Sequence, residues 1–201
     1  MDFYILASLI GIAIFTFKLK DERERIAVLG SHLGKFQIEK LMETLAGGYM
    51  RALAEPGAER QGQIWRQMEN SEQALSEQFS RFAAEFARVP EANARVSKLP
   101  IPLPYASVLF SQKTFDMRKA VAIHAQGIAR AAELQTEQSA KSRAFTLSAE
   151  LFLMQHTCHW FCKSKGIATA RLMMRHKTSY DQLLQAVSPE TRRAYNALVG
   201  N

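Results

Sequence analysis

The stretch Phe3–Phe17, FYILASLIGIAIFTF, decides the architecture that we expect for this chain. It contains fifteen residues without a charge, and Leu19 continues the apolar run beyond Lys18. A helix rises about 1.5 Å per residue, so residues 3–19 extend roughly 25 Å against a hydrocarbon core of about 30 Å. The run has no polar face, which argues against a helix that lies flat in the interface. We therefore predict a short N-terminal membrane anchor, with a buried N-terminal core helix as the alternative.

The charges on the two sides of this run predict its orientation. One acid, Asp2, precedes it, and four cations follow it closely: Lys18, Lys20, Arg23 and Arg25. A cleavable signal peptide has the opposite order, with its cations before the apolar run. By the positive-inside rule, we expect the N-terminus to face out and the bulk of the chain to stay in the cytoplasm. The arrangement resembles that of many small single-pass proteins of the bacterial inner membrane, and we expect that location.

The composition of the remaining chain is that of a folded protein in a reducing compartment. Hydrophobic residues make up 47% of the 201 residues and charged residues 22%, which excludes wholesale disorder. Two cysteines cannot form a disulfide framework. The hydrophobic pattern contains no convincing strand, so we predict an all-α protein in which a single transmembrane helix precedes a helical-bundle cytoplasmic domain.

The most regular segment is a predicted helix at about residues 58–89. Apolar side chains recur there at alternating spacings of three and four, with Glu72 as the polar exception. The larger members of this seam, which we expect to pack against a neighbouring helix, are Trp65, Met68, Leu75, Phe79, Phe82 and Phe86. We interpret the segment as part of an intramolecular bundle, and a coiled coil with a partner or a second copy is the alternative.

Proline and glycine divide the rest of the body. Other helices are expected at about residues 31–55, 107–134, 137–164, 167–176, 179–187 and 189–198, with Gly166 ending the long helix and Ser188 capping the last. The apolar stretch 144–162 is predicted to be a central core helix rather than a second span, because its polar residues would be costly in lipid.

The proline-rich stretch 90–105 is expected to be an extended connector. We expect Ile101, Leu103 and Tyr105 to pack on the core of the protein, and an exposed segment bound by a partner is the alternative. The connector is also the best internal boundary. It divides the chain into an anchor at 1–20, juxtamembrane and coiled-coil-like helices at 21–97 and a helical bundle at 98–201. The alternative is that 21–201 forms one domain.

The densest group of reactive side chains is the stretch HTCHWFC at 156–162, which contains His156, Cys158, His159 and Cys162. These residue types bind zinc and other transition metals, but four of them on one straight helix cannot converge on a single ion. We therefore predict core packing, with no metal and no cofactor. A metal- or thiol-dependent protein centred on Cys158 and Cys162 remains the second hypothesis.

The formal net charge of +7 is concentrated after residue 98. Under a membrane anchor, the economical explanation is attraction to anionic lipid headgroups, and the cations expected to supply it are Arg171, Arg175, Lys177, Arg192 and Arg193. The sequence has no helix-turn-helix, zinc-finger or RNA-binding signature. Because these signatures are missing, a membrane-tethered nucleic-acid-binding protein ranks only third among the hypotheses.

Catalytic motifs are missing from the sequence. It has no GxSxG and no GxGxxG, and Gly30–Lys35 lacks the spacing and the final Ser or Thr of a phosphate loop. Glu150 is the lone acid of an apolar helix, so burial would raise its pKa unless a cation such as Arg143 or Lys163 compensates it. We predict no catalytic residues and a non-enzymatic scaffold, adaptor or accessory subunit of a membrane-associated complex, bound to lipid and to a protein partner or to itself through its helices.

Overall fold

The computed structural model describes residues 2–133 and 139–200, and 81% of these residues are helical. The elements in chain order are α1 (Asp2–Leu33), α2 (Ile38–Ala54), α3 (Ala58–Phe86), α4 (Glu91–Ala94), β1 (Arg95–Ser97), α5 (Ala106–Leu109), a 3-10 turn (Ser111–Lys113), β2 (Thr114–Asp116), α6 (Met117–Ala132), α7 (Ala140–Cys162), α8 (Lys165–His176), α9 (Tyr180–Ala186) and α10 (Pro189–Val199). The prediction of an all-α fold with an N-terminal apolar helix and a following helical domain is confirmed.

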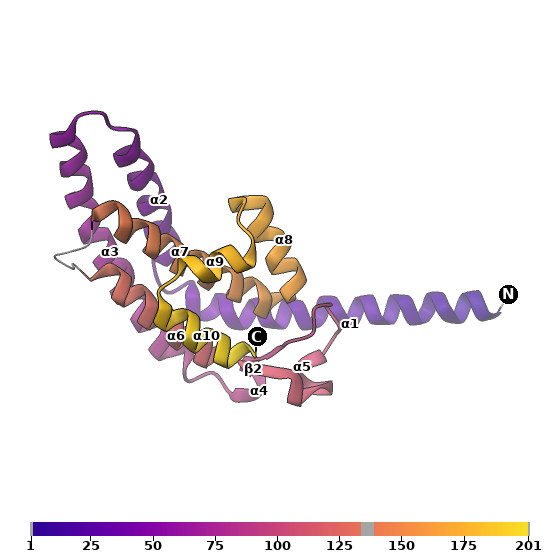
Figure 1. Ribbon diagram of the computed structural model, residues 1–201. Helices are drawn as coiled ribbons and strands as arrows, with labels where there is room; N and C mark the ends of the chain where they lie inside the picture. The colour runs from indigo at the N-terminus through magenta and orange to yellow at the C-terminus, as the bar shows by residue number, and fades with distance from the viewer. Residues whose placement is uncertain (1, 134–138, 201) are drawn as a thin grey trace.

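Helix α1 is continuous over 32 residues, and its N-terminal half projects from the body while its C-terminal half packs against α3 and α7 (Figure 1). The expected first body helix at 31–55 is wrong at its start, because α1 runs on to Leu33 and a turn separates it from α2. The turn begins at Gly34, whose N–H donates to Gly30 O at 2.9 Å. A Cβ at Gly34 would lie 2.9 Å from that same carbonyl, so the close turn requires glycine.

The core of the body is a bundle in which α3 packs against α2 and α6, and α6 packs against α7. One cluster of buried side chains extends from Leu29 to Val199 and draws on both sides of the proline-rich connector. The predicted helix at 58–89 is confirmed as α3, and its large apolar side chains form the middle of this cluster.

Helix α7 is the central element, as predicted. Twelve of its residues are buried, and the remaining face, which contains the exposed Phe145 and the partly exposed Phe152 and His159, is not covered completely. The expectation that Gly166 ends it is wrong: α7 ends at Cys162, and Gly166 lies in the first turn of α8. The sequence signal for this boundary is Ser164, whose Oγ accepts a hydrogen bond from Ile167 N at 3.3 Å and so caps α8.

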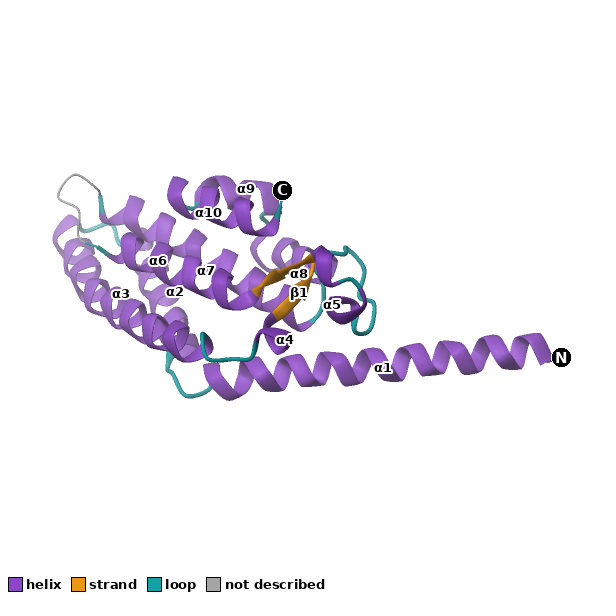
Figure 2. Ribbon diagram, turned by 90° about the horizontal axis from the view of Figure 1, so that it is seen from below, coloured by secondary structure: helices purple, strands orange, loops and turns teal. Residues whose placement is uncertain are grey.

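Two short strands correct the expectation of a strand-free chain. β1 and β2 pair antiparallel with Val96 opposite Phe115, and Figure 2 shows the pair at the edge of the body beside α5. The helix expected from residue 107 therefore begins only at Met117, because Asp116 caps it by accepting a hydrogen bond from Arg118 N at 2.9 Å. The C-terminal helix starts at Ser179 and Ser188 are confirmed, while the expected boundaries at 134 and 137 lie outside the described residues.

Candidate functional site

The N-terminal half of α1 is the most unusual surface of the molecule. Ten large apolar side chains between Phe3 and Phe17 are each at least 50% exposed, and the body covers none of the most apolar window. Within residues 2–133 and 139–200, α1 is the one helix that is long and apolar enough to cross a membrane. The alternative of a buried N-terminal core helix is therefore wrong.

The C-terminal half of α1 is fixed to the body by charged side chains. Arg25 forms an ion pair with Asp21 at 3.0 Å, and its guanidinium also donates to Ser107 Oγ at 2.5 Å and to Arg95 O at 3.0 Å. The buried Glu22 pairs with Lys163 at the end of α7. These contacts join α1 to three distant segments of the chain, so the apolar half and the body form one continuous unit.

The seam residues predicted on α3 lie inside the body. Met68, Leu75, Phe79, Phe82 and Phe86 are each at most 1% exposed. Trp65 is half-buried and its ring lies 5.8 Å from that of Tyr49 on α2. This is the placement that the bundle interpretation predicts. A docking helix, as in the coiled-coil alternative, would have to displace α2 or α6.

Glu72, the polar exception of the seam, belongs to a buried network. Its carboxylate accepts hydrogen bonds from Arg143 Nε at 2.8 Å and from Tyr49 Oη at 2.7 Å, and Arg143 also pairs with Glu69 at 3.1 Å. Burial, together with the adjacent carboxylate, raises the pKa of Tyr49 far above its ordinary value, so its phenol remains a donor. The network joins α2, α3 and α7 and explains why a charge is tolerated in the core.

The five cations predicted to bind headgroups lie on two helices. Arg171, Arg175 and Lys177 are exposed on α8 and its C-terminal cap, next to the exposed Met173 and Met174. Figure 1 shows α8 at the end of the body from which the apolar half of α1 projects.

The other two cations, Arg192 and Arg193, lie in the first turns of α10. Arg193 is within 3.4 Å of Glu190, which offsets part of its charge. The structure therefore groups three of the five predicted residues at the end of the body from which the apolar half of α1 projects.

The histidines and cysteines of α7 have separate surroundings. His156 Nε2 lies 3.1 Å from Thr169 Oγ1, and His159 Nδ1 lies 3.1 Å from Arg171. Burial raises the pKa of Cys158 well above its ordinary value and that of Cys162 to about 11, so both side chains are thiols in the folded protein. Among the described residues, no three His, Cys, Asp or Glu side chains gather around a common point.

Glu150 has different partners from the two cations considered in the sequence. Arg143 forms ion pairs with Glu72 and Glu69, and Lys163 forms an ion pair with Glu22, so neither cation pairs with Glu150. Glu150 instead accepts hydrogen bonds from Ser188 N at 3.0 Å and Ser188 Oγ at 2.8 Å, which tie α7 to the start of α10. Burial raises the pKa of Glu150 despite these bonds.

A chain of buried polar side chains joins α7 to α6 and α10, and no sequence pattern predicts it. Thr157 Oγ1 on α7 lies 2.9 Å from both His124 Nε2 and Tyr195 Oη, so it links α6 and α10. His124 is fully buried and its Nδ1 has no hydrogen-bond partner among the described residues. Burial lowers the pKa of His124 to about 3 and that of His156 to about 4, so both imidazoles are neutral in the folded protein.

Because both histidines are neutral in the folded protein, we expect the protein to lose stability in acid. The unfolded chain binds their protons below about pH 6.5 while the folded chain does not, so the free energy of unfolding falls as the pH falls through that value. We expect each to account for roughly 2 kcal/mol between pH 7 and pH 5. Denaturant unfolding of wild type and His124→Gln at both pH values tests this: the stability advantage of wild type should shrink toward pH 5. An advantage that stays constant or grows would contradict the assignment.

A groove lies where the end of α1 meets the end of α3. Its volume is about 740 Å³, and it is lined by Val28, Ser31, His32, Lys35, Phe36, Arg81, Ala84, Glu85, Arg88, Val89, Pro90 and Asn93. Lys35 and Glu85 pair across it, and Arg81 and Arg88 are exposed. Sequence reasoning missed this site, because its two walls are about fifty residues apart in the chain and neither carries a motif.

Comparison of the chain with protein-family models, with curated proteins and with solved structures finds no match.

Proposed function

We propose that this protein is a single-pass membrane protein whose helical body serves as a non-enzymatic accessory subunit or adaptor at the membrane surface. The observation that carries the proposal is the division of α1. Its first half is apolar and uncovered, and its second half is fixed to the body by the Asp21–Arg25 and Glu22–Lys163 ion pairs. A rigid junction of this kind holds the body at a set distance and angle from the bilayer.

The flanking charges support an orientation with the N-terminus out and the body in the cytoplasm, as in a bacterial inner membrane. Lys18 and Lys20 lie at the end of the apolar run, where they can reach the headgroups. Arg171, Arg175 and Lys177 on α8 would add attraction to anionic lipid on the same side.

The groove between α1 and α3 is the site that we assign to a protein partner. Val28 is nine residues beyond Leu19, so the groove begins roughly 14 Å along the helix from the end of the apolar run and is free of lipid. Its apolar floor contains Phe36 and Val89. Because Glu85 is paired with Lys35, Arg81 and Arg88 leave an excess of positive charge, which suits an acidic amphipathic segment of the partner.

Affinity purification of the tagged full-length protein, after crosslinking in native membranes, tests this proposal. We expect a stoichiometric partner, and we expect Arg81→Glu/Arg88→Glu to reduce its recovery by about tenfold or more through like-charge repulsion. The matched control is Arg60→Glu/Arg66→Glu, which makes the same charge change at exposed positions near the other end of α3. Both variants should remain in the membrane fraction.

Two results would contradict the proposal. Elution of the wild-type protein alone, as monomer or homodimer, would remove the adaptor role. Equal recovery of the partner with the groove and control variants would remove the groove as its site. Reactive thiols or stoichiometric metal in the purified protein would favour the second hypothesis, centred on Cys158 and Cys162.

A further inference from the structure

Five large apolar side chains are exposed within ten residues of the proline-rich connector and α5: Ile101, Leu103, Val108, Leu109 and Phe110. We name residues 98–113 the apolar loop. Val108 and Leu109 at its tip are 68% and 70% exposed, as much as the side chains of the anchor itself. The expectation that Ile101 and Leu103 pack on the core is wrong in that they are 57% and 39% exposed, although both line a small pocket at the end of α7. A segment of this composition needs an apolar environment.

The apolar loop is held at the level of α1 where the apolar run ends. The ring of Tyr105 lies 6.5 Å from that of Phe17, edge to face. Tyr105 N–H donates to Asp21 Oδ2 at 3.1 Å, and Ser107 accepts from Arg25. Figure 1 shows α5 beside α1 at the end of the body from which the apolar half projects. The exposed side chains of the loop thus continue the exposed surface of the anchor.

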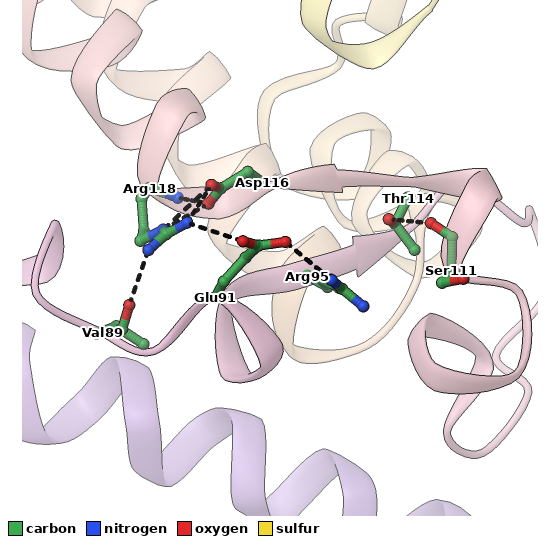
Figure 3. A network of polar contacts seen from close by, with 7 residues as sticks. All are labelled: Val89, Glu91, Arg95, Ser111, Thr114, Asp116 and Arg118. Atoms are coloured by element: carbon green, nitrogen blue, oxygen red, sulfur yellow. Dashed lines mark hydrogen bonds and ion pairs between the residues drawn. The ribbon is translucent and has the colours of Figure 1, made fainter.

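The stem of the apolar loop is stiff. β1 leads into the loop and β2 leads out of it, and the two strands pair across its base. Figure 3 shows side chains that brace this base: Arg118 pairs with Asp116 at 2.7 Å and donates to Val89 O at 3.3 Å, while Glu91 pairs with Arg95 at 2.8 Å. At the far end, Thr114 donates to Ser111 O at 2.7 Å. Stiff strands on both sides fix where the tip points.

The charges of the apolar loop suit a lipid surface. Residues 98–113 contain Lys98 and Lys113 and no carboxylate. Tyr105 is of a residue type enriched at membrane interfaces, and the neighbouring Phe110 adds a large apolar ring. Lys18 and Lys20 lie nearby along α1. Cations and aromatics around a cluster of exposed aliphatic side chains are typical of segments that enter the headgroup layer of an anionic membrane.

We infer that the tip of the apolar loop, Val108–Phe110 with Ile101, inserts into the headgroup layer of the bilayer beside α1. The body then has two attachments, one across the membrane and one in its surface, and cannot rotate freely about α1. A fixed rotation would present the groove between α1 and α3 in one direction. The inference depends on α1 spanning the membrane, as proposed above, and the experiment separates the two claims.

The test places one fluorescent label at a time on full-length protein in vesicles of phosphatidylcholine and phosphatidylglycerol. Cys158→Ala/Cys162→Ala provides the background. An environment-sensitive NBD label is attached at Leu109→Cys, at Ile10→Cys in the anchor, and at Met50→Cys, an equally exposed apolar position on α2 (69% exposed). Nitroxide-bearing lipids then quench any label within the bilayer. Val108→Cys is the second loop position, in case the first variant does not fold.

We expect lipid-borne quencher to reduce the fluorescence of the labels at Leu109 and Ile10, and to leave the label at Met50 unchanged. Quenching at Ile10 without quenching at Leu109 would overturn the loop insertion and leave the anchor intact. No quenching at either position would overturn both claims. A blue-shifted label at Leu109 that lipid-borne quencher does not reach would show that protein covers the loop, a second copy or the partner, and would also overturn the inference.

Discussion

Replacing Ile10 and Ile14 with arginine should release the protein from membranes. Both residues are in the middle of the apolar run and are 51% and 50% exposed, so they make no contribution to the core of the body. An arginine at the centre of a membrane helix costs about 3 kcal/mol on insertion scales, which gives roughly 6 kcal/mol for two. After an alkaline carbonate wash, we expect wild type in the membrane pellet and Ile10→Arg/Ile14→Arg in the supernatant.

The matched control places the same two arginines on the body. Met50 and Leu53 are exposed apolar residues of α2 (69% and 51% exposed), so Met50→Arg/Leu53→Arg adds equal charge at exposed apolar positions of the body. This variant should remain in the pellet. Extraction of the wild-type protein by carbonate, or retention of the anchor variant, would mean that α1 does not cross the bilayer.

The second large effect is expected at Arg143. Its side chain is 4% exposed and pairs with Glu72, which is 1% exposed. Removal of one partner leaves an uncompensated charge in the core, and such changes cost about 3–5 kcal/mol. Arg143→Ala should lower the free energy of unfolding by that amount. Denaturant unfolding in detergent, followed by tryptophan fluorescence, measures it, because Trp65 packs against Tyr49 of the network.

Two further variants separate the ion pair from helix propensity and from cavity formation. Lys141→Ala makes the same kind of truncation at an exposed position of α7 and should change stability by less than about 0.5 kcal/mol. Glu72→Met/Arg143→Met removes both charges and should recover more than half of the loss, because apolar pairs of similar volume can replace buried ion pairs. Equal effects of Arg143→Ala and Lys141→Ala would contradict the role of the network.

Local sequence signals predicted the parts of the fold that depend on periodicity and capping. The apolar run predicts α1, and the apolar residues at alternating spacings of three and four predict α3. Ser179 and Ser188 predict where α9 and α10 begin. Where two signals compete, the sequence alone predicts the wrong boundary. Gly166 indicates a helix end although Ser164 caps the next helix, and Asp116 caps α6 within a segment that the sequence predicts to be helical from residue 107.

The candidate sites depend on long-range contacts, which a single sequence does not specify. The partner of Glu72 is Arg143, 71 residues away, and the contacts of Arg25 are with residues 70 and 82 positions further on. The groove likewise joins two distant segments. The apolar loop was visible in the sequence as KLPIPLPY, but its direction was not, because that direction depends on the β1–β2 stem and on Asp21.

The central claim is that α1 crosses the membrane and places the body on the side of Lys18. Labelling of introduced cysteines with a membrane-impermeant maleimide in intact cells tests it most directly, with Phe3→Cys at the apolar end of α1 and Gln63→Cys on the exposed face of α3. We expect Phe3→Cys to be labelled from outside and Gln63→Cys to be labelled only after the membrane is opened. Labelling of both positions from the same side would contradict the account.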